Sequence, residues 1–145
     1  FHPYCQNNLL QAILEGKRLR AEQEHIQVSY EILLPEKISI NTTDLSSIFF
    51  NLLDNAIEAF SSSGNPDPEI RLSANISNGF LTVYMHNTKN PMQTFTHKTT
   101  KSEPGAHGYG LSIIEDICQK YNGSYQWIDH NNTFDSIVLL QIKNL

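Results

Sequence analysis

One predicted helix, from Thr42 or Thr43 to Phe60, has two faces of very different chemistry. At 100° per residue, Asn55 and Glu58 fall within about 40° of Asn51. The opposite face carries Phe49, Leu53, Ala56 and Phe60. The apolar face requires a second layer to cover it, so the helix must lie on a sheet or on other helices.

The asparagines on this helix allow two interpretations. They can simply be the solvated side of an amphipathic helix, which on spacing alone is the commoner case. However, a solvated face usually carries Lys, Glu and Arg, which are better helix formers than asparagine. Amide oxygens one turn apart, as on Asn51 and Asn55, are also suitable ligands for a hard cation such as Mg²⁺.

The remaining periodicities predict an α+β sandwich. Helical spacing favours helices over about 6–24 and over Leu111–Tyr121, whereas alternation predicts strands over 26–34, 69–77, 80–87, 124–130 and 133–142. Asn78-Gly79 and Asn131-Asn132 are typical hairpin turns, and the sequence SSSGNPDP, 61–68, is predicted to end the asparagine helix. Together these elements predict helices laid over one face of a mostly antiparallel sheet.

Composition excludes several classes of protein. With 145 residues, 39% of them apolar, the chain suits one globular domain. A net charge of -5 disfavours nucleic acid as the main partner. Cys5 and Cys118 form no CxxC pair, and no apolar run approaches membrane-spanning length. There is no signal peptide, and because the sequence starts at Phe1, we expect a piece of a longer protein from a reducing, cytoplasmic setting.

A glycine turn, GAHGYGLSII at 105–114, precedes the last predicted helix. Gly108 and Gly110 let backbone approach a ligand, and a helix start offers free N–H groups that bind phosphates. A merely flexible turn is the commoner explanation of two such glycines. The P-loop pattern is absent, and the dinucleotide pattern GxGxxG fails at Ile113. Any phosphate site here therefore belongs to another fold.

A long segment without periodicity, 88–108, leads into this turn. Segments of this length inside a compact domain are usually functional or disordered. Lys101 could close over a bound polyphosphate, although exposed lysines in loops are normally just solvated. His107 could donate to a phosphate or simply cap the loop.

The order of these features resembles the ATP-binding catalytic domain of sensor histidine kinases. That domain belongs to the GHKL superfamily, with the ATPase subunit of DNA gyrase, a heat-shock chaperone and a mismatch-repair ATPase. The resemblance rests on N-x-x-x-N-A from Asn51, the strand ending at Asn87, T-T-K from Thr99 and H-G-x-G-L from His107. It covers nearly the whole chain and is strongest to the peptide-pheromone and citrate or dicarboxylate sensors. It implies the Bergerat ATP-binding fold: a two-layer α/β sandwich with about three helices on one face of a mixed, mostly antiparallel sheet of about five strands.

The resemblance also assigns roles to residues. Asn51 and Asn55 would be the catalytic residues of the N-box, with Asn55 holding the Mg²⁺ that bridges the ATP phosphates. Asn87 would recognise adenine. The ATP lid would span about 88–107. The other nucleotide-binding residues would be Thr99, Thr100, Lys101, His107, Gly108, Gly110 and Leu111.

Two departures from the family pattern affect this assignment. The commoner adenine box is D-x-G-x-G, whereas this chain has HNTKNP at 86–91. As a neutral amide, Asn87 should hold the adenine amino group less strongly than an aspartate does. Without the family, a strand-end turn residue is an equally good interpretation of Asn87. Glu58 stands where many relatives have lysine, and a carboxylate beside a triphosphate is unfavourable unless metal or water lies between them.

The resemblance implies a histidine kinase reaction, in which the γ-phosphate of ATP moves to a histidine on a dimerisation domain of the same protein. His2 lies too close to Asn51 to be that acceptor and is interpreted as a linker residue. Residues 1–24 would be the helix leaving the dimerisation domain, and 25–145 the ATP-binding domain. The complete protein would be a bacterial membrane-bound sensor with this domain in the cytoplasm and a response regulator downstream, and the excised domain would be a monomer.

Three other hypotheses remain open. The chain could be a degenerate nucleotide-binding module that signals without phosphoryl transfer, which the altered adenine box favours. It could be a serine-kinase anti-sigma factor of the same superfamily, which would be a stand-alone chain starting at methionine. It could also be a structural α+β domain without a ligand, in which case no ATP binding would depend on Asn55.

Overall fold

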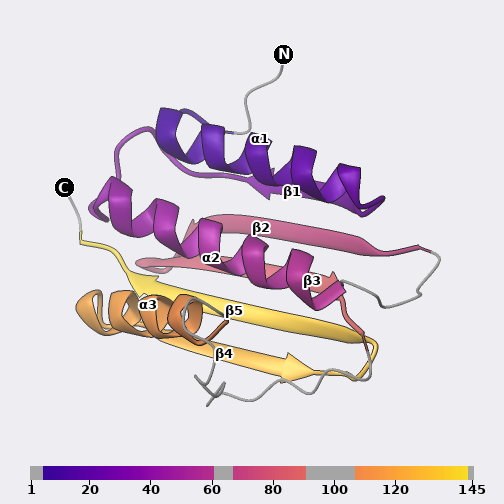
Figure 1. The fold of residues 1–145 in the computed structure, drawn as a ribbon. Coiled ribbons are helices and arrows are strands. Elements are labelled where there is room, and N and C mark those ends of the chain that lie inside the picture. The colour runs from indigo at the N-terminus through magenta and orange to yellow at the C-terminus, as the bar shows by residue number, and fades with distance from the viewer. Residues whose placement is uncertain (1–4, 61–66, 91–106, 144–145) are drawn as a thin grey trace.

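The computed structural model describes residues 5–60, 67–90 and 107–143. Within this part of the chain, three helices lie on one face of a five-stranded sheet (Figure 1). The elements in chain order are α1 (Asn8–Gln23), β1 (Gln27–Ile32), α2 (Thr42–Phe60), β2 (Glu69–Ser77), β3 (Phe80–Thr88), α3 (His107–Lys120), β4 (Ser124–Asp129) and β5 (Thr133–Gln141). The predicted two-layer α+β sandwich is therefore confirmed.

The sheet is mixed, with the strand order β1-β2-β3-β5-β4. β1 pairs with β2 in parallel, and α2 is the crossover between them. The other three pairings, β2 with β3, β3 with β5 and β4 with β5, are antiparallel. Because β5 inserts between β3 and β4, the end of β3 lies beside the start of β5 near the middle of the sheet. This arrangement decides which side chains meet at the site.

Local sequence explains most element boundaries. α1 starts after Asn7, whose Oδ1 accepts a hydrogen bond from the Leu10 amide at 2.9 Å. The β2–β3 turn is a tight one, since Ser77 pairs with Phe80 and both Asn78 and Gly79 have positive φ angles of 55° and 79°. The predicted hairpin is confirmed. α3, in contrast, begins at His107 rather than at Leu111, because its glycines adopt helical backbone angles.

The core lies between the helices and the sheet, and all three helices contribute to it. α2 buries the predicted apolar face, including Phe49 and Leu53. Each such large side chain stabilises the fold by roughly 1.5–3 kcal/mol. α1 buries Leu10, Leu14 and Ala21 completely in the same core. The division of the chain at residue 24 stays a prediction, but in this structure α1 packs as part of the same unit as the rest.

Candidate functional site

Asn51 of α2 and Gly110 of α3 touch. The Asn51 Nδ2 donates to the Ser47 carbonyl oxygen, one turn earlier, at 2.7 Å. This leaves Oδ1 facing α3, and a Cβ atom added to Gly110 would lie only 2.9 Å from it. Any side chain at position 110 would therefore push Asn51 aside. Two features that the sequence predicted separately, the asparagine helix and the glycine turn, come together at this contact.

Asn55 lies one turn further along α2 and is half-buried. In the described part of the chain, no group hydrogen-bonds to its side-chain amide, so the side-chain oxygen can serve as a ligand. The described residues contain no group of three or more His, Cys, Asp or Glu side chains that could hold a metal ion. Mg²⁺ commonly binds through one or two protein oxygens, with substrate phosphates and water completing its shell. A single amide oxygen on Asn55 fits that mode of binding.

The start of α3 supplies backbone to the same place. Gly108 and Gly110 lie in its first turn, whereas the sequence predicted them in the preceding turn segment. The N–H groups of a first turn have no partner within the helix and point toward its N-terminal end, where they attract anions. Leu111 is 5% exposed, so its side chain belongs to the apolar layer beneath the site. The structure describes the backbone of His107 but not its side chain.

Asn87 lies at the end of β3 with its side chain almost fully buried, at 1% exposure. It shares the helix-covered face with Leu81, Val83 and Met85. Its Nδ2 donates to the Thr88 carbonyl oxygen at 3.1 Å. This hydrogen bond orients the amide, so Oδ1 is the atom that remains to accept a hydrogen bond from a ligand. Asn87 was predicted to end this strand, and the strand continues for one further residue, through Thr88.

Sequence patterns did not identify several neighbours of Asn87. Phe134 of β5 pairs with Asn87 across the sheet, and the Trp127 ring stacks on the Phe134 ring with their centroids 5.9 Å apart. Lys89 is 4% exposed, and its Nζ lies 3.3 Å from an Asp129 carboxylate oxygen. The alternation in 133–142 placed Phe134 on a buried face, but only the β3–β5 pairing brings it beside Asn87. A buried lysine just after a strand has no signature in local sequence.

Part of the predicted site lies outside the described residues. This applies to Thr99, Thr100 and Lys101, to most of the predicted lid, 91–106, and to His2. The first residues of the predicted lid are packed against the domain. Thr88 ends β3, the Lys89 amide donates to the Asn132 carbonyl, and the Asn90 amide donates to the Ala59 carbonyl at the end of α2.

A polar network joins the start of α2 to the end of α3. Asp44 accepts hydrogen bonds from the Lys120 ammonium and from the Tyr121 hydroxyl, both at 2.7 Å. The same hydroxyl accepts a hydrogen bond from the Asn41 amide at 3.0 Å. Burial alone would raise the pKa of Asp44, but the hydrogen bonds and the Lys120 charge outweigh burial and lower it. The network fixes the two helices that carry Asn51 and Gly110.

Comparison with known proteins connects this geometry to a family. The family model described as the GHKL domain matches residues 40–144. The chain is also 28% identical, over 132 residues, to a probable C4-dicarboxylate sensor kinase of Halalkalibacterium halodurans. That match covers 83% of this chain and 24% of the kinase, so the chain spans about a quarter of that relative's length.

Solved structures of histidine kinases share the fold. The catalytic domain of histidine kinase ThkA superposes with a TM-score of 0.72 at 19% identity, covering 93% of this chain and 92% of that one. Full-length ShkA in complex with AMPPNP gives 0.73 at 17% identity, covering 99% of this chain and 31% of that one. The Acinetobacter baumannii kinase AdeS gives 0.71 at 12% identity, covering 94% and 64%. The chain belongs to the GHKL domain family, and its fold is that of histidine kinase catalytic domains.

Proposed function

We propose that this domain binds ATP together with Mg²⁺ and transfers the γ-phosphate to a histidine of a dimerisation domain. The observation that carries the proposal is the contact between Asn51 and Gly110. This contact brings the face of α2 that carries the asparagine side chains against the start of α3, where backbone N–H groups are free. Amide oxygens suit the metal and the helix start suits phosphate, so the two chemistries that a metal-bound nucleotide needs are adjacent.

Each residue has a role in this proposal. Asn55 presents its amide oxygen to the metal, and Asn51 lines the wall between the metal and α3. The α3 backbone at Gly108 and Gly110 receives the phosphates, and Asn87 accepts a hydrogen bond from the adenine amino group through Oδ1. When bound, Mg²⁺ neutralises charge on the phosphates. Phosphoryl transfer needs little covalent chemistry from the protein, mainly positioning and charge neutralisation. Thr99, Thr100, Lys101 and His107 complete the proposed site.

The partners in this proposal come from the resemblance to sensor kinases. The phosphoryl acceptor is a histidine on a dimerisation domain of the same protein, and a response regulator acts downstream. We also propose that the domain belongs to a membrane-bound bacterial sensor and faces the cytoplasm. Among the described residues, none of the helices has the length and apolar character needed to cross a bilayer.

One alternative has an observation in its favour. The buried Lys89 occupies the position of the first glycine in D-x-G-x-G, and the Asn87 amide is neutral. Both changes weaken the case for tight adenine binding, so the domain could be a nucleotide-binding interaction module that transfers no phosphate. Incubating the domain with γ-labelled ATP and a dimerisation domain separates the two hypotheses. Label on that domain's histidine supports the kinase, and ATP binding without any labelled product supports the module.

The binding itself is tested by calorimetric titration of ATP with and without Mg²⁺. We expect Mg²⁺ to strengthen ATP binding to the unmodified chain. Asn55→Ala should abolish this Mg²⁺-dependent gain, because it removes the proposed metal ligand. Asn75→Ala is the matched control, since Asn75 is exposed on β2 and its side chain lies on the other face of the sheet.

The control should leave ATP binding unchanged. If the unmodified chain shows no ATP binding in either condition, the kinase proposal fails. If Asn55→Ala retains the full effect of Mg²⁺, the assignment of Asn55 as metal ligand fails.

A further inference from the structure

Asp54 lies within the asparagine helix but outside the asparagine face. Its direction is about 60° from that of Asn51 around the helix axis, on the side opposite to Asn55. It therefore points toward α1, which runs alongside α2 (Figure 1). Asp54 had no role in the sequence interpretation, because the faces were drawn around Asn51.

Two cations of α1 converge on one oxygen of this carboxylate. The Lys17 Nζ lies 2.9 Å from the Asp54 Oδ1, and the Arg20 Nη1 lies 2.6 Å from the same atom. The Lys17 Nζ also lies 3.7 Å from the centroid of the Phe50 ring, one turn before Asp54. Lys17 thus binds two consecutive turns of α2 at once, through an ion pair and a cation–π contact.

This pairing differs from an ordinary surface ion pair. The Lys17 side chain is only 11% exposed and that of Asp54 29%, so the contact is partly shielded from water. Exposed pairs contribute little to stability, whereas removing one partner of a buried pair leaves an uncompensated charge. Burial alone would raise the pKa of Asp54, but the hydrogen bonds and charges of Lys17 and Arg20 outweigh burial and lower it.

Lys17 and Arg20 both lie on α1, which is firmly packed against the rest of the domain. α1 is anchored by Leu10, Leu14 and Ala21, which are fully buried in the core. The Tyr30 hydroxyl of β1 donates to the Leu14 carbonyl at 2.8 Å and ties α1 to the sheet as well. The ion pairs of Asp54 with α1 therefore restrain the rotation of α2 about its own axis, in addition to the burial of its apolar face.

Rotation of α2 decides where its amide groups point. The Asn55 side chain has no hydrogen-bond partner among the described residues, so its direction depends on the helix that carries it. We propose that Asp54 is a positioning residue, held by Lys17 and Arg20, that sets the rotation of α2 and so aims Asn55 at the metal site. This inference rests on the proposed function, since it assigns a support to the proposed metal ligand.

The test compares the effect of Mg²⁺ on ATP affinity in Asp54→Asn and in the unmodified chain. The measured quantity is the ratio of the ATP dissociation constants without and with Mg²⁺. Substituting a residue that orients a metal ligand typically costs 10–100-fold in metal affinity. We expect the ratio to fall about tenfold in Asp54→Asn, with a smaller change in metal-free ATP binding. A purely structural role would lower the melting temperature and leave this ratio unchanged in the folded variant.

Two further variants keep the test decisive if Asp54→Asn folds poorly. Lys17→Met should reduce the ratio similarly, and combining it with Asp54→Asn should add little, because both remove the same contact. Arg18→Met is the matched control. Arg18 pairs with Glu15 and Glu22 within α1 itself, so its loss should leave the ratio unchanged.

The outcomes separate this inference from the proposed function. If the unmodified chain binds ATP with an Mg²⁺-dependent gain, and folded Asp54→Asn and Lys17→Met retain that gain, only the positioning role is overturned. If the unmodified chain shows no such gain, the proposed metal site fails and the positioning role fails with it.

Discussion

At the scale of single residues, position 110 must both fit into a helix and leave room for the Asn51 side chain. Glycine is a poor residue for a helix, costing roughly 0.5–1 kcal/mol relative to alanine. At position 110 it nevertheless lies in the first turn of α3, where any Cβ would meet the Asn51 Oδ1. The glycine is explained by this close approach rather than by flexibility.

Gly110→Ala should therefore weaken ATP binding. The added methyl would displace the Asn51 amide, which forms part of the wall between the proposed metal and phosphate subsites. We expect a severalfold loss of ATP affinity by calorimetry, with little loss of stability because alanine favours the helix. Gly16→Ala in α1 is the control, since no atom lies within 4 Å of its added Cβ.

The control variant should bind ATP normally and gain about 0.5–1 kcal/mol in free energy of unfolding. Equal ATP affinity in Gly110→Ala and the unmodified chain would show that this contact has no part in binding.

At the scale of helices and strands, α2 is held on both sides. Lys17 and Arg20 of α1 bind it through Asp54. Lys120 at the end of α3 and Tyr121 just after it bind its first turn through Asp44. These contacts act at the flanks of the helix, while the apolar face lies on the sheet. The orientation of the asparagine face is thus set by three neighbours and not by propensity within α2.

Tyr121→Phe should loosen the connection between α2 and α3. The hydroxyl donates to Asp44 and accepts from the Asn41 amide, so its removal leaves two polar groups without this partner. We expect the free energy of unfolding, measured with a chemical denaturant, to fall by about 1–2 kcal/mol. Lys120→Met should have a smaller effect, because the lysine is largely exposed and its pairing is screened by water. A larger loss in Lys120→Met than in Tyr121→Phe would contradict this ranking.

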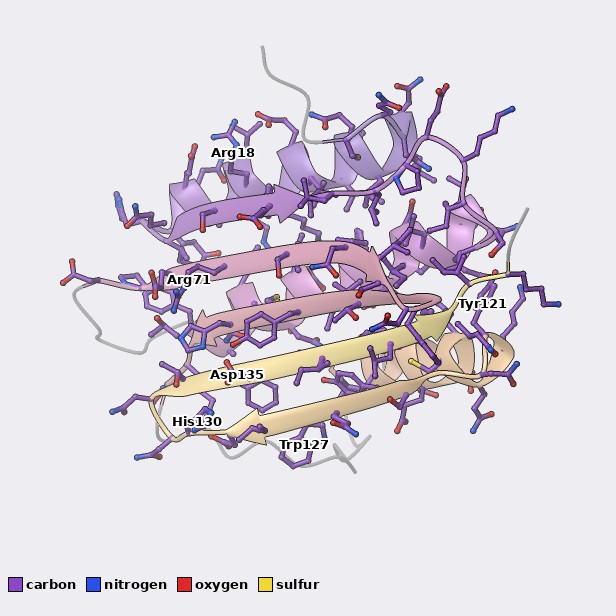
Figure 2. All side chains as sticks on the ribbon, turned by 180° about the vertical axis from the view of Figure 1, so that it is seen from behind. Arg18, Arg71, Tyr121, Trp127, His130 and Asp135 are labelled. Carbon is purple, nitrogen blue, oxygen red and sulfur yellow. The ribbon has the colours of Figure 1, made fainter. Side chains whose placement is uncertain are left out.

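At the scale of the whole molecule, the two faces of the sheet differ in what covers them. The helices and the candidate site occupy one face, and the other face carries polar side chains, among them Arg71 and Asp135 (Figure 2). Asp135 of β5 lies 2.5 Å from His86 Nδ1 and 3.1 Å from His130 Nε2, and it accepts a hydrogen bond from the Tyr84 hydroxyl. This cluster joins β3 to β5 on the side away from the site.

The cluster predicts an acid-dependent contribution to stability. Burial alone would raise the pKa of Asp135, but the hydrogen bonds from His86 and His130, the His86 charge and the Tyr84 hydroxyl outweigh it and lower the pKa. Because the folded-state pKa is the lower one, the carboxylate stabilises the fold above its unfolded-state pKa of about 3.9. The stabilisation is lost as the pH falls through the folded-state pKa.

Asp135→Asn should therefore be less stable than the unmodified chain at pH 5. The difference in free energy of unfolding between the two should shrink steadily between about pH 4 and the folded-state pKa, as followed by denaturant titration. ATP binding at neutral pH should not change, because the cluster is on the far face. A difference that stays constant, or that grows as the pH falls, would contradict the assignment.

The sequence by itself determined the elements and their faces. Helical and alternating periods are local properties, and they placed α2, both hairpins and the buried side of β3 almost residue by residue. The two asparagines and the glycines could also be singled out as candidate site residues, because residues of low helix propensity are unusual within or beside a helix. The start of α3 was predicted four residues too late, since glycines are read as a turn although they can adopt helical angles.

Only the tertiary structure decided which of these residues meet. Asn51 and Gly110 lie on different helices, Phe134 reaches Asn87 because β5 inserts beside β3, and Lys17 finds Asp54 across two helices. The burial of Lys89 beside Asp129 has the same origin. Such contacts depend on strand order and helix packing over long sequence separations, which local periodicity does not encode. The residue types of the candidate site could therefore be recognised in the sequence. Which of them come into contact, and the contact of α1 with Asp54, follow from the fold.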